Sequence, residues 1–362
     1  MLLSELTSDV PRLALVGLAK NTGKTVALNA LLAELADAGR RVAVTSVGRD
    51  GEEHDVIDFR IEKPAVALLA GSIVASTDSL LRASGVALRP LASTGVRTPL
   101  GEVQIAELIE DGTIEIAGPS GAADVRAVAD EMLGHGAEQV LIDGAIDRRA
   151  ASSPDVADGL VMSTGAILSE DIDELVQRTV DAVALVRLPT FAAGEQERSL
   201  LRAGTDAFIA GEDGLPPIAL PPRFVLTADE EALSGLLSEH AEARRLLIGG
   251  ALPERFVRDA AAVARRRGRD LTLVVADPTK IFLHEHGLEF YGRQGVAIEA
   301  LTPIDLRALT VNPVAPQSHS FDSARLRSQL AAAIPGTSIY DVMGAEYRGE
   351  QGLRPRMRAT RS

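Results

Sequence analysis

A glycine, a lysine and a threonine stand side by side at the end of the segment GLAKNTGKT, residues 17–25. These residue types suit the binding of a nucleotide phosphate. Gly23 lets backbone N–H groups approach the phosphate oxygens, and Lys24 can reach the β and γ oxygens. The hydroxyl of Thr25 is suited to ligate Mg²⁺. The segment therefore predicts a phosphate-binding loop (P-loop) with Lys24 as a catalytic residue.

The spacing of the two glycines is unusual. The common motif would place its first glycine at Leu18, whereas Gly17 leaves five residues before Gly23. We interpret this as a variant spacing, because the residues that carry the chemistry are intact. The residues predicted to contact the nucleotide within the loop are Gly17, Ala19, Lys20, Asn21, Thr22, Gly23, Lys24, Thr25 and Val26.

The distribution of lysine supports this prediction. The chain has 37 basic residues, and lysine occurs only at positions 20, 24, 63 and 280. Two of these lysines fall inside the loop. A compact ammonium fits among phosphate oxygens differently from a guanidinium, so the placement favours a phosphate site. For Lys20, a phosphate or cross-subunit role and a solvated loop lysine remain equal alternatives.

Two aspartates are candidates for holding Mg²⁺ together with Thr25 and for taking part in catalysis. Asp143 ends the apolar segment VLIDGA, at the edge where α/β folds keep their ligand sites. Its alternative role is to cap a turn. Asp50 follows an apolar segment in SVGRDGE, but Asp50-Gly51 is also ordinary turn chemistry. We predict both as metal ligands.

A third candidate lies far along the chain. Asn312 follows the apolar segment ALTV and precedes a proline. An asparagine just past a strand is suited to reading an adenine edge, although Asn-Pro is also a common turn. We include Asn312 among the predicted nucleotide contacts.

The elements that must position these residues follow from the apolar patterns. Residues 12–17 predict a buried strand, residues 24–39 a helix and residues 40–48 a second strand. Strands are also predicted near residues 139–148 and 158–166, with helices at 122–137 and 171–186. This order predicts an α/β fold with a mostly parallel sheet. The alternating segment 101–118 contains Asp111-Gly112 and predicts a hairpin.

The remaining residues predict a second α/β unit. We expect a P-loop nucleotide-binding domain at 1–190, a proline-containing crossing segment at 191–240 and the second domain at 241–345. Residues 346–362 form a basic tail that we expect to be disordered.

Composition excludes several classes of function. The chain has 362 residues, no cysteine and a formal net charge of −14. The absence of cysteine excludes disulfides and thiol catalysis, and the acidic balance argues against nucleic-acid binding. The N-terminal segment lacks a targeting pattern, and no apolar run is long enough to span a membrane. We expect a cytoplasmic protein, compatible with a homo-oligomer.

Several phrases of the chain together resemble one family. They are AKNTGKT, SVGRDGE, KPAVALLAGSIVAST, TGVRTPLGEV, LIDGAIDR, ADGLVMSTGA, DPTKIFL and LTVNPVAP. They resemble the ATPase subunit of the reactivase for lysine 5,6-aminomutase, and the loop spacing resembles dethiobiotin synthetase within the SIMIBI group of P-loop ATPases. The resemblance implies an ATPase that acts with a MutS-like partner subunit on an adenosylcobalamin-dependent aminomutase.

Three hypotheses for function follow. The first is an Mg²⁺-dependent ATPase that remodels a partner protein. The second is an ATP-dependent small-molecule ligase of the dethiobiotin synthetase type. The third is a nucleotide-binding regulatory or scaffold module with little turnover. No N-K-x-D segment specifies guanine, which favours ATP as the nucleotide.

Overall fold

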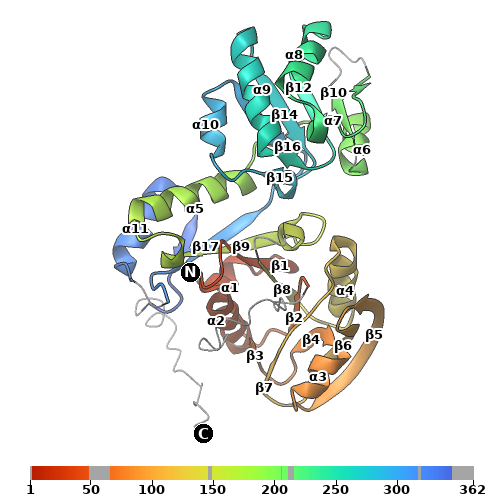
Figure 1. The fold of residues 1–362 in the computed structure, drawn as a ribbon. Helices are drawn as coiled ribbons and strands as arrows, with labels where there is room; N and C mark the ends of the chain where they lie inside the picture. Colours follow the sequence, from red (N-terminus) through yellow and green to blue (C-terminus); the bar gives the residue numbers. More distant parts are fainter. Residues whose placement is uncertain are drawn as a thin grey trace. The chain divides into compact units, whose positions relative to one another are not determined.

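A computed structural model describes residues 2–48, 66–145, 149–204, 206–210, 216–316 and 319–344. The chain divides into two compact units. Unit 1 contains Met1–Thr179 and Leu306–Ser362, and unit 2 contains Val180–Asp305. Unit 2 is thus inserted into the sequence of unit 1, and the two units are described separately (Figure 1).

Unit 1 is built on a sheet of nine strands among the described residues. The strands are β1 (Arg12–Gly17), β2 (Val42–Ser46), β4 (Ile73–Thr77), β5 (Leu88–Thr98), β6 (Gly101–Leu108), β8 (Gln139–Ala145), β9 (Gly159–Gly165), β17 (Leu306–Asn312) and β18 (Ser338–Tyr340). Their order in the sheet is β18-β17-β9-β1-β8-β2-β4-β6-β5. All pairs from β18 to β4 are parallel, and β6 and β5 are antiparallel. The predicted α/β class with a mostly parallel sheet is confirmed.

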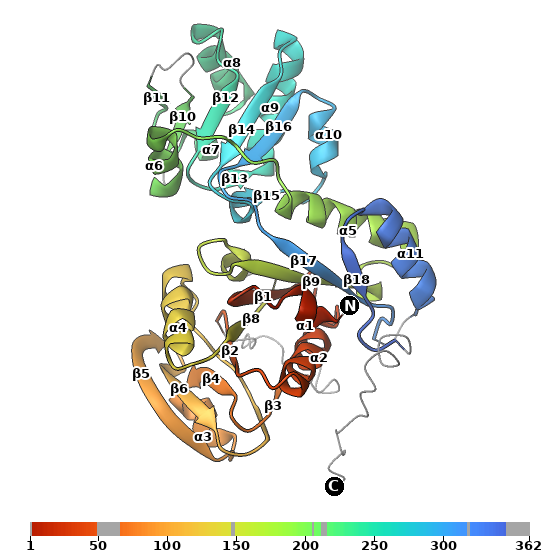
Figure 2. The ribbon, with the colours of Figure 1, turned by 180° about the vertical axis from the view of Figure 1, so that it is seen from behind.

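Helices cover this sheet, as the views from the two sides show (Figures 1 and 2). They are α1 (Leu3–Leu6), α2 (Lys24–Asp37), α3 (Asp78–Ala83), α4 (Ala122–Gly134), α11 (Ser323–Ala333) and the part of α5 (Ile172–Val186) up to Thr179, where unit 1 passes into unit 2. Two 3₁₀ turns, Arg149–Ser152 and Ala166–Leu168, and a small sheet of β3 (Val66–Leu68) and β7 (Gly112–Ile114) complete the described part of unit 1. The predicted strands and helices at both sides of the loop therefore form.

The core of unit 1 joins β1 to α2. Leu13 and Leu15 point from β1 into the core, and Leu28, Leu31 and Leu35 of α2 are fully buried. The spacing of the three helical leucines places them on one face of α2, which packs on the sheet. This packing fixes the direction in which the loop between β1 and α2 leaves the sheet.

The predicted hairpin at Asp111-Gly112 is wrong. β6 pairs with β4 and β5, whereas β7 pairs with β3. Gly112 is required for space, since a Cβ there would overlap the side chain of Val86. The hairpin that forms is β5–β6, in which Thr98 pairs with Gly101.

Unit 2 contains a five-stranded sheet with the order β11-β10-β12-β14-β16 among the described residues. The strands are β10 (Ala207–Ile209), β11 (Ile218–Ala219), β12 (Arg245–Ile248), β14 (Leu271–Val275) and β16 (Val296–Ala300). The helices are α6 (Glu195–Ala203), α7 (Phe224–Thr227), α8 (Glu230–Glu239), α9 (Glu254–Arg267) and α10 (Leu288–Gly292). A 3₁₀ turn at Pro278–Lys280, the short strands β13 (Leu252–Pro253) and β15 (Ile281–Phe282), and the end of α5 from Val180 complete the described part of unit 2.

A buried carboxylate holds part of unit 2 together. Glu254, at the start of α9, accepts hydrogen bonds from the backbone N–H groups of residues 284–286 and from the hydroxyl of Tyr291. Burial alone would raise the pKa of Glu254, but these hydrogen bonds outweigh it and keep the pKa below its ordinary value. Burial and the same carboxylate raise the pKa of Tyr291. Glu254 therefore ties the segment after β15 to α9 as a carboxylate.

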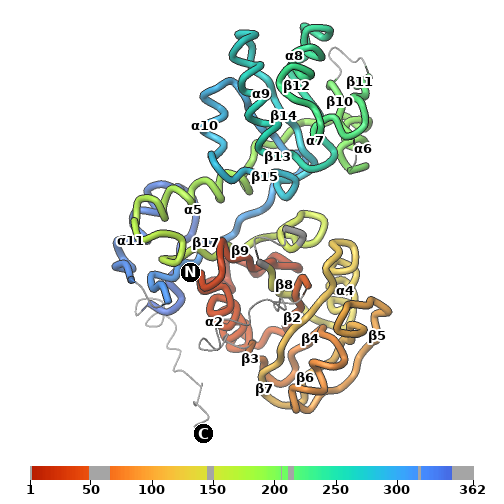
Figure 3. The backbone as a smooth tube through the Cα atoms, viewed as in Figure 1, coloured from red at the N-terminus to blue at the C-terminus, as the bar shows by residue number. Residues whose placement is uncertain are grey.

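The division into units differs from the one expected from the sequence. Residues 191–240 form α6, β10, β11, α7 and α8 of unit 2 rather than a crossing segment. β17 returns to the sheet of unit 1, where it lies between β9 and β18. Its side chains from Ala308 to Val311 are all buried, which a strand with neighbours on both sides satisfies. Figure 3 traces this path out through α5 and back through β17.

No helix of the described residues is long and apolar enough to span a bilayer.

Candidate functional site

The predicted loop lies at the carboxyl edge of the unit 1 sheet. It joins the end of β1 at Gly17 to the start of α2 at Lys24. β1 lies between β8 and β9, and all three strands run in the same direction. Residues that follow β8 and β9 therefore reach the same edge as the loop, which is where open α/β sheets place their ligands.

The path of the loop depends on two residues with positive φ and on one close approach. Asn21 has a φ of 65° and Gly23 a φ of 86°. Asparagine and glycine adopt this left-handed conformation most readily. The buried hydroxyl of Thr22 donates to Ala19 O at 3.0 Å. A Cβ on Gly17 would lie 2.5 Å from that hydroxyl oxygen, so Gly17 is needed for space.

The loop ends at the positive end of a helix. α2 has 14 residues, and its N-cap is Gly23, which has no side chain to cap the helix. Its first turn contains no acidic residue. The first backbone N–H groups of a helix have no partners within the helix and favour an anion. This end of α2 is therefore suited to an anionic group.

Lys24 and Asp143 meet at this edge. Lys24 Nζ lies 2.8 Å from Asp143 Oδ1, and the two side chains are only 13% and 14% exposed. The register explains the contact, since Asp143 pairs with Leu15 of β1 on one side and with Ser46 of β2 on the other. The backbone O of Asp143 also accepts a hydrogen bond from Val47 N at 2.9 Å. The strand order thus places a carboxylate beside the lysine of the loop.

Asn312 also reaches the loop, because β17 belongs to the sheet of unit 1. Its Nδ2 donates to Asn21 O at 3.0 Å, and its Oδ1 accepts from Val314 N at 3.1 Å. A Cβ on Gly23 would lie 3.1 Å from the Cβ of Asn312. The sequence-predicted site residues Asn21, Gly23 and Asn312 are therefore in contact, although 291 positions separate Asn21 and Asn312 in the chain.

The other predicted site residues have different settings. Thr25 and Val26 are the second and third residues of α2 and are half-buried, and Lys20 is exposed on the loop. Asp50 lies outside the described residues. Within the described ranges, no group of three or more His, Asp or Glu side chains is arranged to hold a metal ion. The described candidates for a Mg²⁺ site are the Asp143 carboxylate and the Thr25 hydroxyl.

Two contacts at this edge were not predicted from the sequence. Leu18 N donates to Ser163 O of β9 at 2.9 Å, which fixes the first residue of the loop. Gly118 lies against the end of β2, where a Cβ would overlap Ser46 O. In the sequence, the segments that contain Ser163 and Gly118 are compatible both with a phosphate or substrate contact and with an ordinary strand-to-helix turn, so only the strand order reveals their place.

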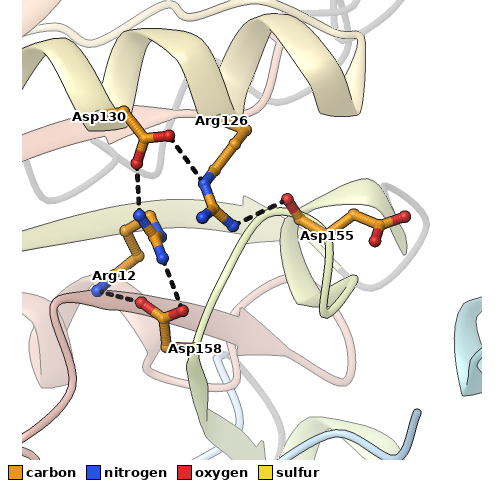
Figure 4. A network of polar contacts seen from close by, with 5 residues as sticks. All are labelled: Arg12, Arg126, Asp130, Asp155 and Asp158. Carbon is orange, nitrogen blue, oxygen red and sulfur yellow. Dashed lines mark hydrogen bonds and ion pairs between the residues drawn. The ribbon is translucent and has the colours of Figure 1, made fainter.

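A charged network holds the opposite end of β1 (Figure 4). Arg12 Nη2 donates to Asp158 Oδ1 at 2.7 Å, and Arg12 Nη1 pairs with Asp130 of α4. Arg126 Nε donates to Asp130 Oδ2 at 2.9 Å, and its Nη1 donates to Asp155 O at 3.3 Å. The network joins β1 to α4 and to the segment before β9, so it positions the strand that carries the loop.

No family model, curated protein or solved structure matches the chain.

Proposed function

We propose that the chain is an Mg²⁺-dependent ATPase with residues 17–25 as its P-loop. The observation that carries the proposal is the ion pair between Lys24 and Asp143 at the uncapped start of α2. A lysine, a carboxylate and a helix N-terminus at one point are the groups that a magnesium-bound triphosphate requires. The residues present therefore fit the nucleotide and the ion.

Each residue has a distinct proposed role. The first N–H groups of α2 and the ammonium of Lys24 bind and orient the phosphate oxygens. Asp143 and the Thr25 hydroxyl hold Mg²⁺, directly or through water. The ion, when bound, neutralises charge that develops on the phosphate oxygens. Asp143 also holds the ammonium of Lys24 at the loop through their ion pair.

A more specific proposal is that ATP hydrolysis by this chain drives the remodelling of a protein partner. The sequence resembles the ATPase subunit of an aminomutase reactivase, which implies an adenosylcobalamin-dependent aminomutase and a MutS-like subunit as partners. The chain enters unit 2 after β9 and leaves it into β17. Both strands contact the loop, through Ser163 and Asn312. This connectivity favours a remodelling ATPase over a minimal small-molecule ligase. We also propose that the protein is cytoplasmic.

The dependence on Mg²⁺ tests the role of Asp143. The variant Asp143→Asn keeps the size of the side chain and removes its charge. We expect its ATP hydrolysis to need a higher Mg²⁺ concentration than that of the unaltered chain, while ATP binding without Mg²⁺ changes less. Phosphate release measured over a Mg²⁺ titration checks this. The same Mg²⁺ response in both proteins would contradict the role of Asp143.

A second experiment tests the remodelling hypothesis. The full chain is used as bait in an extract of its native organism, with and without ATP. The remodelling hypothesis expects an aminomutase or a MutS-like protein to bind in a manner that depends on ATP. Their repeated absence, combined with ATP hydrolysis that is stimulated by a small carboxylic acid, would favour the ligase.

A further inference from the structure

Asn312 lies between the end of β9 and the loop, and its amide is bound to the loop backbone. We propose that Asn312 is a positioning residue that holds the P-loop in its phosphate-binding conformation, rather than a residue that reads the base. The inference rests on the proposed function, because it assigns a role within that site.

The hydrogen bonds of the amide carry the first part of the argument. Asn312 Nδ2 donates to Asn21 O, and Asn312 Oδ1 accepts from Val314 N. Reading an adenine edge requires the same amide to present a donor and an acceptor to the base. Here the two bonds within the chain set the plane of the amide and direct it at the loop backbone. Contacts within the protein therefore orient the amide, and the amide points toward the loop backbone.

The bond to Asn21 acts at the point where the loop turns through a left-handed conformation. Asn21 has a φ of 65°, a left-handed conformation that is uncommon for residues other than glycine, although asparagine tolerates it best among them. The C=O and N–H of one trans peptide point in opposite directions. A bond that fixes Asn21 O therefore also directs the N–H of Thr22 to the side away from Asn312. Asn312 in this way orients a loop N–H group without contacting a ligand itself.

Steric contacts on both sides of Asn312 support the same role. A Cβ on Gly23 would lie 3.1 Å from Asn312 Cβ, and a Cβ on Gly165 would lie 2.7 Å from Asn312 O. The φ of Gly165 is −179°, an extended value that any residue adopts. Gly165 is therefore required for space and not for its backbone conformation. The two glycines therefore let Asn312 lie directly against both the loop and the end of β9.

The test compares three ligands in the presence of Mg²⁺: ATP, inosine triphosphate and inorganic tripolyphosphate, which has no base. The variant Asn312→Leu keeps the approximate shape, adds no charge beside the phosphates and cannot donate to Asn21 O. Isothermal titration calorimetry on the full chain gives the affinities. We expect about fivefold to tenfold weaker binding, the effect of one hydrogen bond, by the same factor for all three ligands. The preference for ATP over inosine triphosphate then stays unchanged.

A different pattern would overturn the inference. A base-reading residue would lose the preference between ATP and inosine triphosphate and leave tripolyphosphate binding unaltered. Unaltered binding of all three ligands would also overturn it. If the unaltered chain binds neither ATP nor tripolyphosphate, the proposed function itself fails, and the inference fails with it.

A second variant reaches Asn312 from the other side and leaves its side chain chemically unchanged. Gly165→Ala would push the end of β17 away from β9, and we expect it to weaken tripolyphosphate binding at least as much as Asn312→Leu does. The matched control is Gly134→Ala at the end of α4, where an added Cβ would meet nothing within 4 Å. Equal tripolyphosphate affinity in these two glycine variants, with both proteins folded by circular dichroism, would contradict the role of Asn312.

Discussion

The tight contact between Gly17 and Thr22 makes a sharp prediction about the conformation of the loop. In the variant Gly17→Ala, the new Cβ would lie 2.5 Å from Thr22 Oγ1 and 3.2 Å from Ala19 O. The first separation is too short for any real Cβ contact, so Thr22 must move and its hydrogen bond to Ala19 O must break. Because Thr22 is 1% exposed, it has little room to do so.

The size of the effect follows from these contacts. Overpacking at a buried position costs about 1–3 kcal/mol. The variant Thr22→Ala loses the hydrogen bond to Ala19 O, which costs about 1 kcal/mol. In the double variant the oxygen that clashes is gone, so only the tighter approach to Ala19 O remains. We therefore expect the double variant to be less destabilised than the sum of the two single variants by about 1–2 kcal/mol.

Hydrogen-exchange mass spectrometry is the suitable assay, because the chain has no tryptophan and its two units need not unfold together. The opening free energy is measured for peptides that cover β1, the loop and the start of α2. Peptides of unit 2 serve as the internal control and are expected to remain unchanged. Additivity of the two substitutions to within about 0.5 kcal/mol would refute this description of the loop.

Two further predictions concern buried charged contacts, one inside unit 2 and one inside unit 1. Glu254→Gln should destabilise unit 2 by about 2 kcal/mol near neutral pH, more than Glu289→Gln at an exposed position of α10, as measured by hydrogen exchange of unit 2 peptides. The pKa of Glu254 is lowered in the folded state. The contribution of Glu254 to the stability of unit 2 is therefore full above the ordinary glutamate pKa of about 4.3 and is lost as pH falls through the lowered pKa. This pH dependence should be missing in Glu254→Gln. Arg12→Met should lower the opening free energy of β1 by about 2 kcal/mol, since the Arg12 side chain is 13% exposed and binds two carboxylates. Arg82→Met is the control, because the Arg82 side chain is 79% exposed, and it should change the opening free energy by less than about 0.5 kcal/mol. Equal effects of the two substitutions within either pair would contradict the importance given to Glu254 or Arg12.

The local elements around the loop could be predicted from the sequence because their signals are local. The apolar run of β1, the loop and the leucines of α2 are contiguous in the chain, and the structure has them where the pattern indicates. The place of Asp143 at the loop edge of the sheet could be predicted from the assumption of parallel strands that end at one edge, whereas its ion pair with Lys24 was not predicted.

The features that the sequence did not predict depend on pairings between distant segments. β17 follows the strands of unit 2 and looks like one of them, yet its partners are β9 and β18. Gly112 follows an aspartate and looks like a hairpin residue, whereas it is needed for space against Val86. In both cases the local pattern is compatible with two arrangements, and only packing between distant parts of the chain decides between them.

The central claim is that Lys24 belongs to a site that hydrolyses ATP. Its most direct test is the release of phosphate from ATP by the full chain with Mg²⁺, compared with that of the variant Lys24→Ala. The control is Lys280→Ala in unit 2, which removes another of the rare lysines. We predict that hydrolysis is abolished in Lys24→Ala and retained in Lys280→Ala, with both proteins folded. Undiminished hydrolysis in a folded Lys24→Ala protein would contradict the assignment of the P-loop.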